Sequence, residues 1–196
     1  MILNIPNKCS SPEEYGNNSF MSSKEINIFT ENIYPEWSGV KEFDEFKIIQ
    51  NTRKIVEFYL DQLTDVSCLE GFDFDTLTFD ILFCDSKKTH QINREYREKD
   101  YPADIITFAI FADDGAKFVL DNDINLGEII IALDKVSEEA KKHDVTDRYE
   151  LYFLIAHGIL HLLGFDHQSE EDYNFVVEVQ KKALRYAEIG EKDEQI

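Results

Sequence analysis

The sequence predicts an α+β domain in which helices pack over a small mixed sheet of about four strands. Three observations lead to this class. Segments in which apolar and polar residues alternate, as in strands, are interleaved with segments whose apolar residues recur every three or four positions, as in helices. One segment, 151–163, is apolar on nearly every side, so a helix there must be buried between the sheet and other helices. With 196 residues, the chain has the length of one domain with a substantial core.

The first half of the chain contains two predicted strands and two predicted helices. The strands are the alternating segments Glu25–Thr30 and Leu77–Cys84. Apolar residues at helical spacing over Phe43–Leu63 predict the first helix. A second helix is predicted over about 86–98, and Ser86 is a suitable N-cap for it.

Two apolar segments in the middle of the chain predict further strands. Pro102 separates the second helix from the strand Ile105–Phe111, because proline has no backbone N–H to donate. This strand has few polar residues, so we expect it at the centre of the sheet. A turn is predicted at 113–115. Gly127 then opens the next buried strand, Glu128–Leu133.

Three further helices complete the predicted domain. Either Asp134 or Ser137 caps a short helix that ends at about residue 143. Asp147 caps the long apolar helix. Ser169 begins the last helix, which has acidic residues in its first turn and extends to about residue 186.

Composition divides the chain into three parts. Residues 1–25 hold several Pro, Gly, Asn and Ser with little periodicity and predict a poorly ordered lead-in. Residues 26–187 form the single predicted domain, and residues 188–196 form a charged tail. Met21 is a second candidate for the translation start, a hypothesis that N-terminal sequencing of the native protein tests.

The chain is strongly acidic. It has 40 Asp and Glu against 20 Lys and Arg, which gives a formal net charge of -20. Such a charge favours solubility and works against non-specific attraction to nucleic acid. An RNA substrate would therefore require local positive charge, supplied by a metal ion and by a few Lys and Arg around a cleft.

Cysteine usage and hydropathy predict where the protein resides. Cys9, Cys68 and Cys84 are far apart and odd in number, which is typical of free thiols in a reducing compartment. No segment has the length and apolarity of a membrane span. The N-terminus lacks the basic start and apolar core of a signal peptide. We expect a cytoplasmic protein without a membrane partner.

Three of the five histidines lie in one stretch of eleven residues. His157 and His161 are four positions apart, so a helix places them on the same face. Gly164 can end that helix in the left-handed conformation, after which His167 can return towards the other two. Three converging neutral imidazoles suit a divalent metal, zinc above all, and leave one coordination position open. The simpler interpretation is that each histidine is a packed or surface residue, but their spacing on an apolar segment favours a metal site.

The histidine stretch also carries a family resemblance. Residues 157–167 read His-Gly-Ile-Leu-His-Leu-Leu-Gly-Phe-Asp-His and resemble the signature of the YbeY family of bacterial rRNA maturation factors, His-Gly-x-Leu-His-Leu-x-Gly-Tyr/Phe-Asp-His. Residues 93–108 resemble the family's Asn-x-x-Tyr/Phe-Arg-x-Lys-Asp-x-Pro-Thr-Asp-Val-Leu-Ser-Phe, and residues 126–131 resemble its Leu-Gly-Asp-Ile-x-Ile. The resemblance covers about residues 41–187. Its departures are Ala103 for Thr, Thr107 for Ser, Ala109 for Pro and Glu128 for Asp.

The resemblance implies a metal-binding domain with a histidine-bearing central helix, a layout like that of metalloproteases. It implies a zinc-dependent, single-strand-specific endoribonuclease that acts in 16S rRNA 3′-end maturation and ribosome quality control, with small-subunit ribosomal proteins as partners. His157, His161 and His167 would hold one zinc ion per chain, and Arg97 and His157 would be catalytic.

The residues support a nuclease in two further respects. Zincin proteases read His-Glu-x-x-His with the Glu as general base, whereas this chain has Gly158 at that position. Arg97 is suited to meet the negative charge that develops on a phosphate, with Arg94 and Lys99 nearby. Without the resemblance, a surface ion pair would be the simpler role for Arg97. Asp166 either orients an imidazole or serves as a turn residue after the helix.

Three functions stay open from the sequence. The first is the metal-dependent endoribonuclease. The second is a ribosome-assembly factor whose metal is mainly structural, an alternative that the acidic surface favours because ribosomal proteins are basic. The third is another metal hydrolase with a peptide or small-molecule substrate, which the glycine after the first histidine argues against.

Overall fold

The computed structural model describes residues 24–39, 44–63, 66, 68–112, 117, 119–167 and 169–192. Within these ranges four strands form one sheet: β1 (Glu25–Asn32), β2 (Thr76–Cys84), β3 (Ile105–Phe108) and β4 (Asp123–Ala132). The helices are α1 (Glu45–Gln62), α2 (Ser86–Tyr96), α3 (Leu133–His143), α4 (Asp147–Leu162) and α5 (Glu170–Tyr186). The predicted α+β class with a small mixed sheet is confirmed.

Several predictions on the ends and loops of the chain fall outside this description. They are the lead-in over residues 1–23, the turn at 113–115 and the tail over 193–196. The described start of the tail lies against the domain, because Ile189 is buried and the Thr146 backbone N–H donates to the Glu191 carbonyl at 3.0 Å. The division into lead-in, domain and tail stays a prediction. None of the described helices is both long enough and apolar enough to span a membrane.

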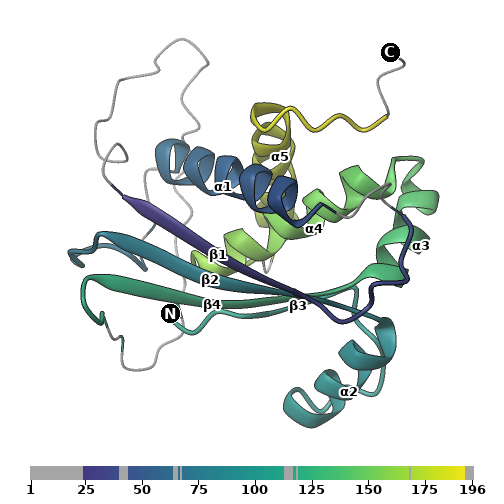
Figure 1. Cartoon of the computed structure of the whole chain (residues 1–196). Helices are drawn as coiled ribbons and strands as arrows, with labels where there is room; N and C mark the ends of the chain where they lie inside the picture. Colours follow the sequence, from purple (N-terminus) through teal and green to yellow (C-terminus); the bar gives the residue numbers. More distant parts are fainter. Residues whose placement is uncertain are drawn as a thin grey trace.

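The sheet has the strand order β1-β2-β4-β3. The pairs β1–β2 and β2–β4 are parallel, and β3 pairs with β4 in the antiparallel direction. Figure 1 shows α1 and α4 on one face of the sheet, with α5 beyond them, and α2 on the opposite side. The helix α4 therefore lies in the middle of the molecule, in contact with strands below and with helices around it.

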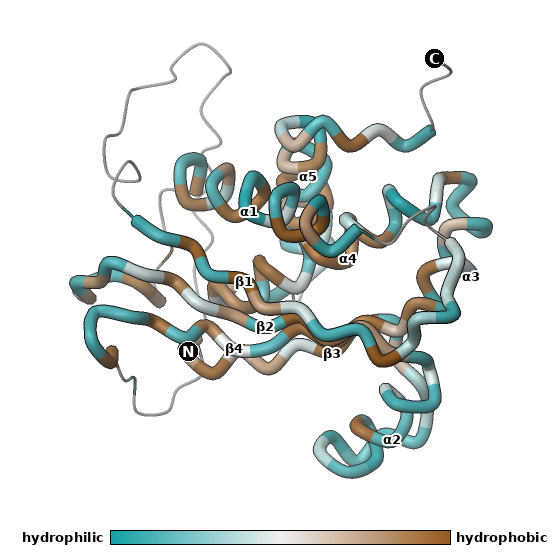
Figure 2. Tube along the Cα trace, viewed as in Figure 1, coloured by the Kyte–Doolittle hydropathy of each residue, from teal (hydrophilic) through white to brown (hydrophobic). Residues whose placement is uncertain are grey.

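Alternation along β2 explains why one face of the sheet forms the core. Its side chains Leu77, Phe79, Ile81 and Phe83 are at most 1% exposed and face the helices. Figure 2 shows this apolar layer continuing from the strands into α4. The predicted burial of α4 is confirmed, since most of its residues are buried.

The prediction that 105–111 forms a central strand is wrong. The strand β3 ends at Phe108 and lies at the edge of the sheet. It has few polar residues because both of its faces are covered. Ile105 packs against the main core, whereas Ile106 packs in a second, smaller cluster with Ile92 of α2.

The strand β4 begins at Asp123, five residues before the predicted start at Glu128. Gly127 lies inside the strand, where the register with β2 shifts between Thr78 and Phe79. Its φ is +124°, and a Cβ atom built there would lie 1.9 Å from the Phe108 carbonyl oxygen of β3. Glycine is therefore required at this bulge, and it marks the close approach of β3 and β4 rather than the start of a strand.

Three predicted N-caps lie at other residues than expected. Asp85, not Ser86, caps α2, and Thr146, not Asp147, caps α4 with its hydroxyl accepting from the Tyr149 N–H at 3.1 Å. The cap of α3 is Ala132, which has no side-chain oxygen. The predicted cap at Ser169 is confirmed, since Ser169 and Asp172 form a reciprocal capping box.

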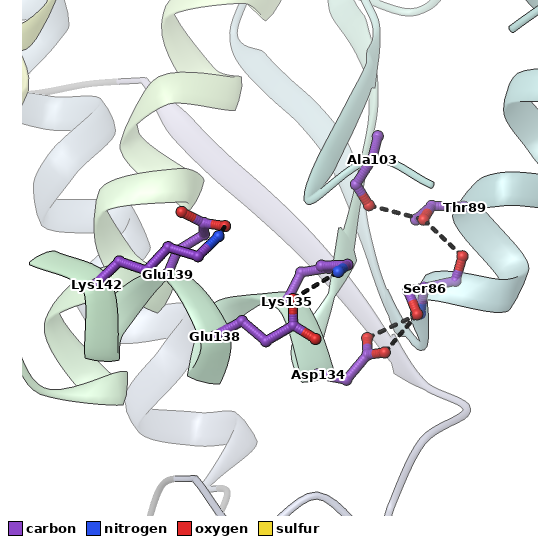
Figure 3. A network of polar contacts seen from close by, with 8 residues as sticks. All are labelled: Ser86, Thr89, Ala103, Asp134, Lys135, Glu138, Glu139 and Lys142. Carbon is purple, nitrogen blue, oxygen red and sulfur yellow. Dashed lines mark hydrogen bonds and ion pairs between the residues drawn. The ribbon is translucent and has the colours of Figure 1, made fainter. Parts of the chain in front are cut away.

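Asp134 instead joins the first turns of two helices. Its carboxylate accepts hydrogen bonds from the backbone N–H and the hydroxyl of Ser86, at the start of α2 (Figure 3). One turn further along α2, the buried Thr89 hydroxyl donates to the Ala103 carbonyl at 2.7 Å, just before β3. These contacts fix α2 against α3 and against the segment that enters β3.

Candidate metal centre

The end of α4 directs the histidine stretch back on itself. The helix ends at Leu162, and Gly164 has a φ of +85°. The Gly164 N–H donates to the His161 carbonyl and the Phe165 N–H donates to the Leu160 carbonyl, both at 2.9 Å, which is the hydrogen-bond pattern of a glycine-ended helix. The reversal predicted at Gly164 is confirmed, and it carries His167 towards the helix.

Three imidazoles converge at this reversal. Nε2 of His157 lies 3.0 Å from Nε2 of His161. The His167 ring centroid lies 5.3 Å from that of His157 and 5.5 Å from that of His161. One ring nitrogen from each residue lies within 4.8 Å of the others, and no other set of His, Cys, Asp or Glu in the described chain is as suited to hold a metal.

The donor set fits zinc. A tetrahedral zinc ion with Zn–N bonds of about 2.0–2.1 Å separates its nitrogen ligands by about 3.3 Å, close to the His157–His161 distance. Ligand nitrogens must also be unprotonated. Burial, followed by the neighbouring imidazoles of His161 and His167, lowers the pKa of His157 from 6.5 to about 4. Burial is also the main cause that lowers the pKa of His161. These two imidazoles are therefore neutral at pH 7.

A cleft of about 480 Å³ opens beside the imidazoles. Its walls come from the histidine stretch, from β3 and from the end of α2. The lining residues are Arg97, Ile105, Thr107, Phe108, Ala109, Ala112, His157, His161, Gly164, Phe165 and Asp166. The structure thus brings Arg97 and two of the histidines to one cavity, although Arg97 precedes them by 60 positions in the chain.

Arg97 follows the last turn of α2, where buried polar residues hold the chain. Its N–H donates to the Asn93 carbonyl at 3.0 Å, and the Lys99 N–H donates to the same carbonyl at 3.0 Å. The Asn93 side chain, 1% exposed, donates to the Tyr101 carbonyl at 2.9 Å. In the described chain no acid forms an ion pair with Arg97. The guanidinium is therefore available to a ligand in the cleft.

The other two cations considered near Arg97 are not brought to the cleft. Arg94 pairs with Asp100 at 3.5 Å and lines a separate cavity of α2 with Lys87 and His90. Lys99 lies over the ring of Tyr101, 6.0 Å from its centroid. Arg97 is thus the cation that shares a cavity with the histidines.

Asp166 acts as a turn residue. Its Oδ1 accepts from the His167 backbone N–H at 2.8 Å, which fixes the chain between the helix end and the third histidine. Its charge also raises the pKa of His161, against the larger effect of burial. Outside the cleft, His90 pairs with Asp100, His143 pairs with Glu150, and Cys84 is buried.

Gly158 is required by packing. A Cβ atom on Gly158 would lie 2.8 Å from Cγ2 and 2.9 Å from Cδ1 of Ile129 on β4. The helix can lie this close to the sheet only because the position has no side chain. A glutamate general base of the zincin kind therefore has no room after the first histidine.

Comparison with known proteins gives a consistent set of relatives. A family model described as "Endoribonuclease YbeY" matches residues 38–188. Relatives of the same name include one from Fusobacterium nucleatum, 39% identical over 117 residues, which are 59% of this chain and 71% of the relative. A Geobacillus protein is 43% identical over 107 residues, 53% of this chain and 69% of the relative. One from Oceanobacillus iheyensis is 34% identical over 139 residues, 68% of this chain and 90% of the relative.

Proposed function

Because the chain belongs to the YbeY endoribonuclease family, we propose that it is a zinc-dependent, single-strand-specific endoribonuclease that acts in 16S rRNA 3′-end maturation and ribosome quality control. The observation that carries this proposal is the arrangement of three imidazoles around one point, beside a cleft that Arg97 also lines. We assign His157, His161 and His167 as ligands of one zinc ion per chain.

The proposed chemistry divides between the metal and the chain. His157, His161 and His167 would hold a zinc ion, which would lower the pKa of a coordinated water towards neutrality and so supply a nucleophile at pH 7. Arg97 donates hydrogen bonds to the phosphate oxygens, whose negative charge increases in the transition state. We assign His157 a catalytic part because it would hold the metal beside the cleft that Arg97 lines.

The shape and charge of the cleft support a single-stranded substrate. A cavity of about 480 Å³ is within the usual range for small-ligand sites and accepts a nucleotide of a flexible strand rather than a duplex. With a net charge of -20, the chain repels RNA phosphates over most of its surface. Affinity would then depend on Arg97 and the metal.

The first experiment measures both the metal content and the RNA cleavage of the same proteins. Elemental analysis of the purified protein should give about one zinc per chain, and His161→Ala should lose it. His143→Ala is the matched control, because His143 lies outside the cleft on α3 and pairs with Glu150. Zinc-loaded wild type should cleave a single-stranded oligonucleotide with the sequence of the 16S rRNA 3′ end, whereas His161→Ala should not. A folded wild type that binds zinc and leaves this RNA intact would contradict the nuclease.

The acidic charge favours one alternative, a ribosome-assembly factor with a mainly structural metal. Its acidic surface would bind basic small-subunit ribosomal proteins. Cells that carry His157→Ala or Arg97→Ala as their only copy separate the two functions. If cleavage is lost while ribosome co-sedimentation and 16S rRNA maturation persist, the assembly factor is the better description.

A peptidase is disfavoured by the packing of Gly158, and hydrolysis of peptides by the purified protein would restore it.

A further inference from the structure

A glutamine of α5 is buried next to the histidine-bearing helix. Gln180 is 0% exposed, and it lies on the apolar face of α5 with Val176, Val179, Ala183 and Leu184. A polar side chain is costly at such a position unless each end of its amide has a partner. The position of Gln180 therefore calls for a specific reason.

One end of the Gln180 amide is fixed to α4. Its Nε2 donates to the Phe153 carbonyl at 3.0 Å, one helical turn before His157. Because a carbonyl accepts only from a donor, this bond assigns the nitrogen to the Phe153 side and the oxygen to the free end. Within the described chain, Oε1 is buried and has no partner at regular hydrogen-bond geometry.

His157 needs the kind of partner that Oε1 offers. Its Nε2 faces Nε2 of His161, so this is the nitrogen that must be unprotonated to bind a metal. The ring proton must then be on Nδ1, which requires an acceptor. Phe153 and His157 are one turn apart on the same face of α4, so an amide bound to the Phe153 carbonyl lies beside the His157 ring. Gln180 also raises the pKa of His157, as an acceptor from an imidazole N–H does, against the effect of burial.

We propose that Gln180 is a positioning residue, whose Oε1 accepts a hydrogen bond from Nδ1 of His157 and thereby fixes the tautomer and ring orientation that the metal requires. His161 has a counterpart in the Phe165 backbone, which raises the pKa of His161 against the effect of burial. The difference is that the partner of His157 comes from another helix. The packing of α5 on α4 is then part of the metal site.

This inference rests on the proposed function in one respect, that the imidazoles bind zinc. The test uses the purified full-length chain and zinc alone, without RNA. In zinc-free protein labelled with ¹⁵N-histidine, long-range ¹H–¹⁵N spectra should show His157 with its proton on Nδ1. Gln180→Leu should lose this single tautomer, because leucine offers no acceptor to Nδ1.

Zinc affinity, measured by competition with a chelator, provides the second readout. We expect Gln180→Leu to weaken zinc binding about 10–100-fold. Thr52→Val is the matched control and should bind as wild type. It removes an equally buried and unpartnered hydroxyl from α1, outside the histidine site.

Two results would overturn the proposal: a wild-type His157 with its proton on Nε2, or a Gln180→Leu protein that binds zinc as tightly as wild type. If Gln180→Leu does not fold, the tautomer of His157 in the wild-type protein tests the proposal on its own. A protein whose zinc affinity depends on Gln180 but which leaves RNA intact would refute the nuclease and keep this inference. If the protein cleaves RNA but its zinc affinity does not depend on Gln180, this inference is refuted and the nuclease is kept.

Discussion

Nε2 of His157 lies 3.0 Å from Nε2 of His161, one turn away on α4. Two imidazole nitrogens at this distance must share a proton or a cation, because their lone pairs repel each other. Burial and the neighbouring imidazoles lower the pKa of His157 to about 4, so its imidazolium form is disfavoured at pH 7. The neutral pair can therefore bind a metal ion without competition from a second proton, and its titration gives the first prediction.

The zinc-free protein should become less stable as the pH falls below neutral, because of His157. Its pKa of about 4 in the folded chain is below the ordinary 6.5, so the unfolded chain binds more protons between these values. The stabilisation is present above about pH 6.5 and is lost as the pH falls through about 4, by up to about 3 kcal/mol. Urea unfolding of wild type and His157→Gln over this range measures it, since titration of the acidic residues cancels in the difference. Parallel curves for the two proteins would contradict the prediction.

Gly158→Ala should destabilise the protein. The new Cβ would overlap Ile129 on β4 and push α4 away from the sheet. We expect a loss of about 1–3 kcal/mol in the free energy of unfolding, although alanine alone favours a helix by about 1 kcal/mol. Denaturant unfolding measures this loss. In a double-mutant cycle, Ile129→Ala should make the cost of Gly158→Ala smaller, and strictly additive effects would exclude the contact as its cause.

Arg97→Ala should reduce RNA cleavage by about 10²–10³-fold in kcat/KM, the effect of removing one donor to transition-state charge. Arg97→Lys should recover only part, because an ammonium group cannot donate two parallel hydrogen bonds. Arg94→Ala is the matched control on the same helix, since Arg94 pairs with Asp100 outside the cleft, and it should stay within about threefold of wild type. Equal losses from Arg94 and Arg97 would indicate general attraction of RNA instead of a specific contact.

Asn93→Ala should impair cleavage, although Asn93 itself does not contact the RNA. The Asn93 side chain donates to the Tyr101 carbonyl, and the Asn93 backbone carbonyl accepts from the N–H groups of Arg97 and Lys99. Loss of the buried amide should cost about 1–3 kcal/mol of stability and loosen the position of Arg97. Cleavage rates at a temperature where each variant is folded measure the effect. The double variant with Arg97→Ala should be no slower than Arg97→Ala alone, and a further loss would show that Asn93 acts on something other than Arg97.

Regular patterns in the sequence predicted the parts of this fold that follow from local chemistry. Alternation located β1 and β2, helical spacing located α1, and the nearly uniform apolar character of 151–163 located α4. The four-residue spacing of His157 and His161 located the candidate site. The helix caps were displaced where two capping residues are adjacent, as at Asp85 with Ser86, because either side chain could accept the hydrogen bond.

The position of β3 could not be predicted in the same way. An apolar strand can be central or can be an edge strand covered on both faces, and only the packing of α2 and α4 against β3 distinguishes them. Asn93 and Thr89 were missed because a single polar residue in a helix gives no sequence signal of burial. Gln180 did offer one, since it interrupts the apolar face of α5, where the pattern alone favours an aliphatic side chain.

The compact spacing of the histidines has a consequence for the order of events during synthesis. All three lie within eleven consecutive residues, so the loop that joins them closes at a small entropic cost. A nascent chain presents this complete chelating segment as soon as His167 has emerged, before α5 can pack on α4. Arg97 lies far upstream and reaches the cleft only through pairing of β3 with β4 and docking of α4. Metal capture can thus begin on the growing chain, whereas the site that would bind RNA is assembled only when the domain has folded.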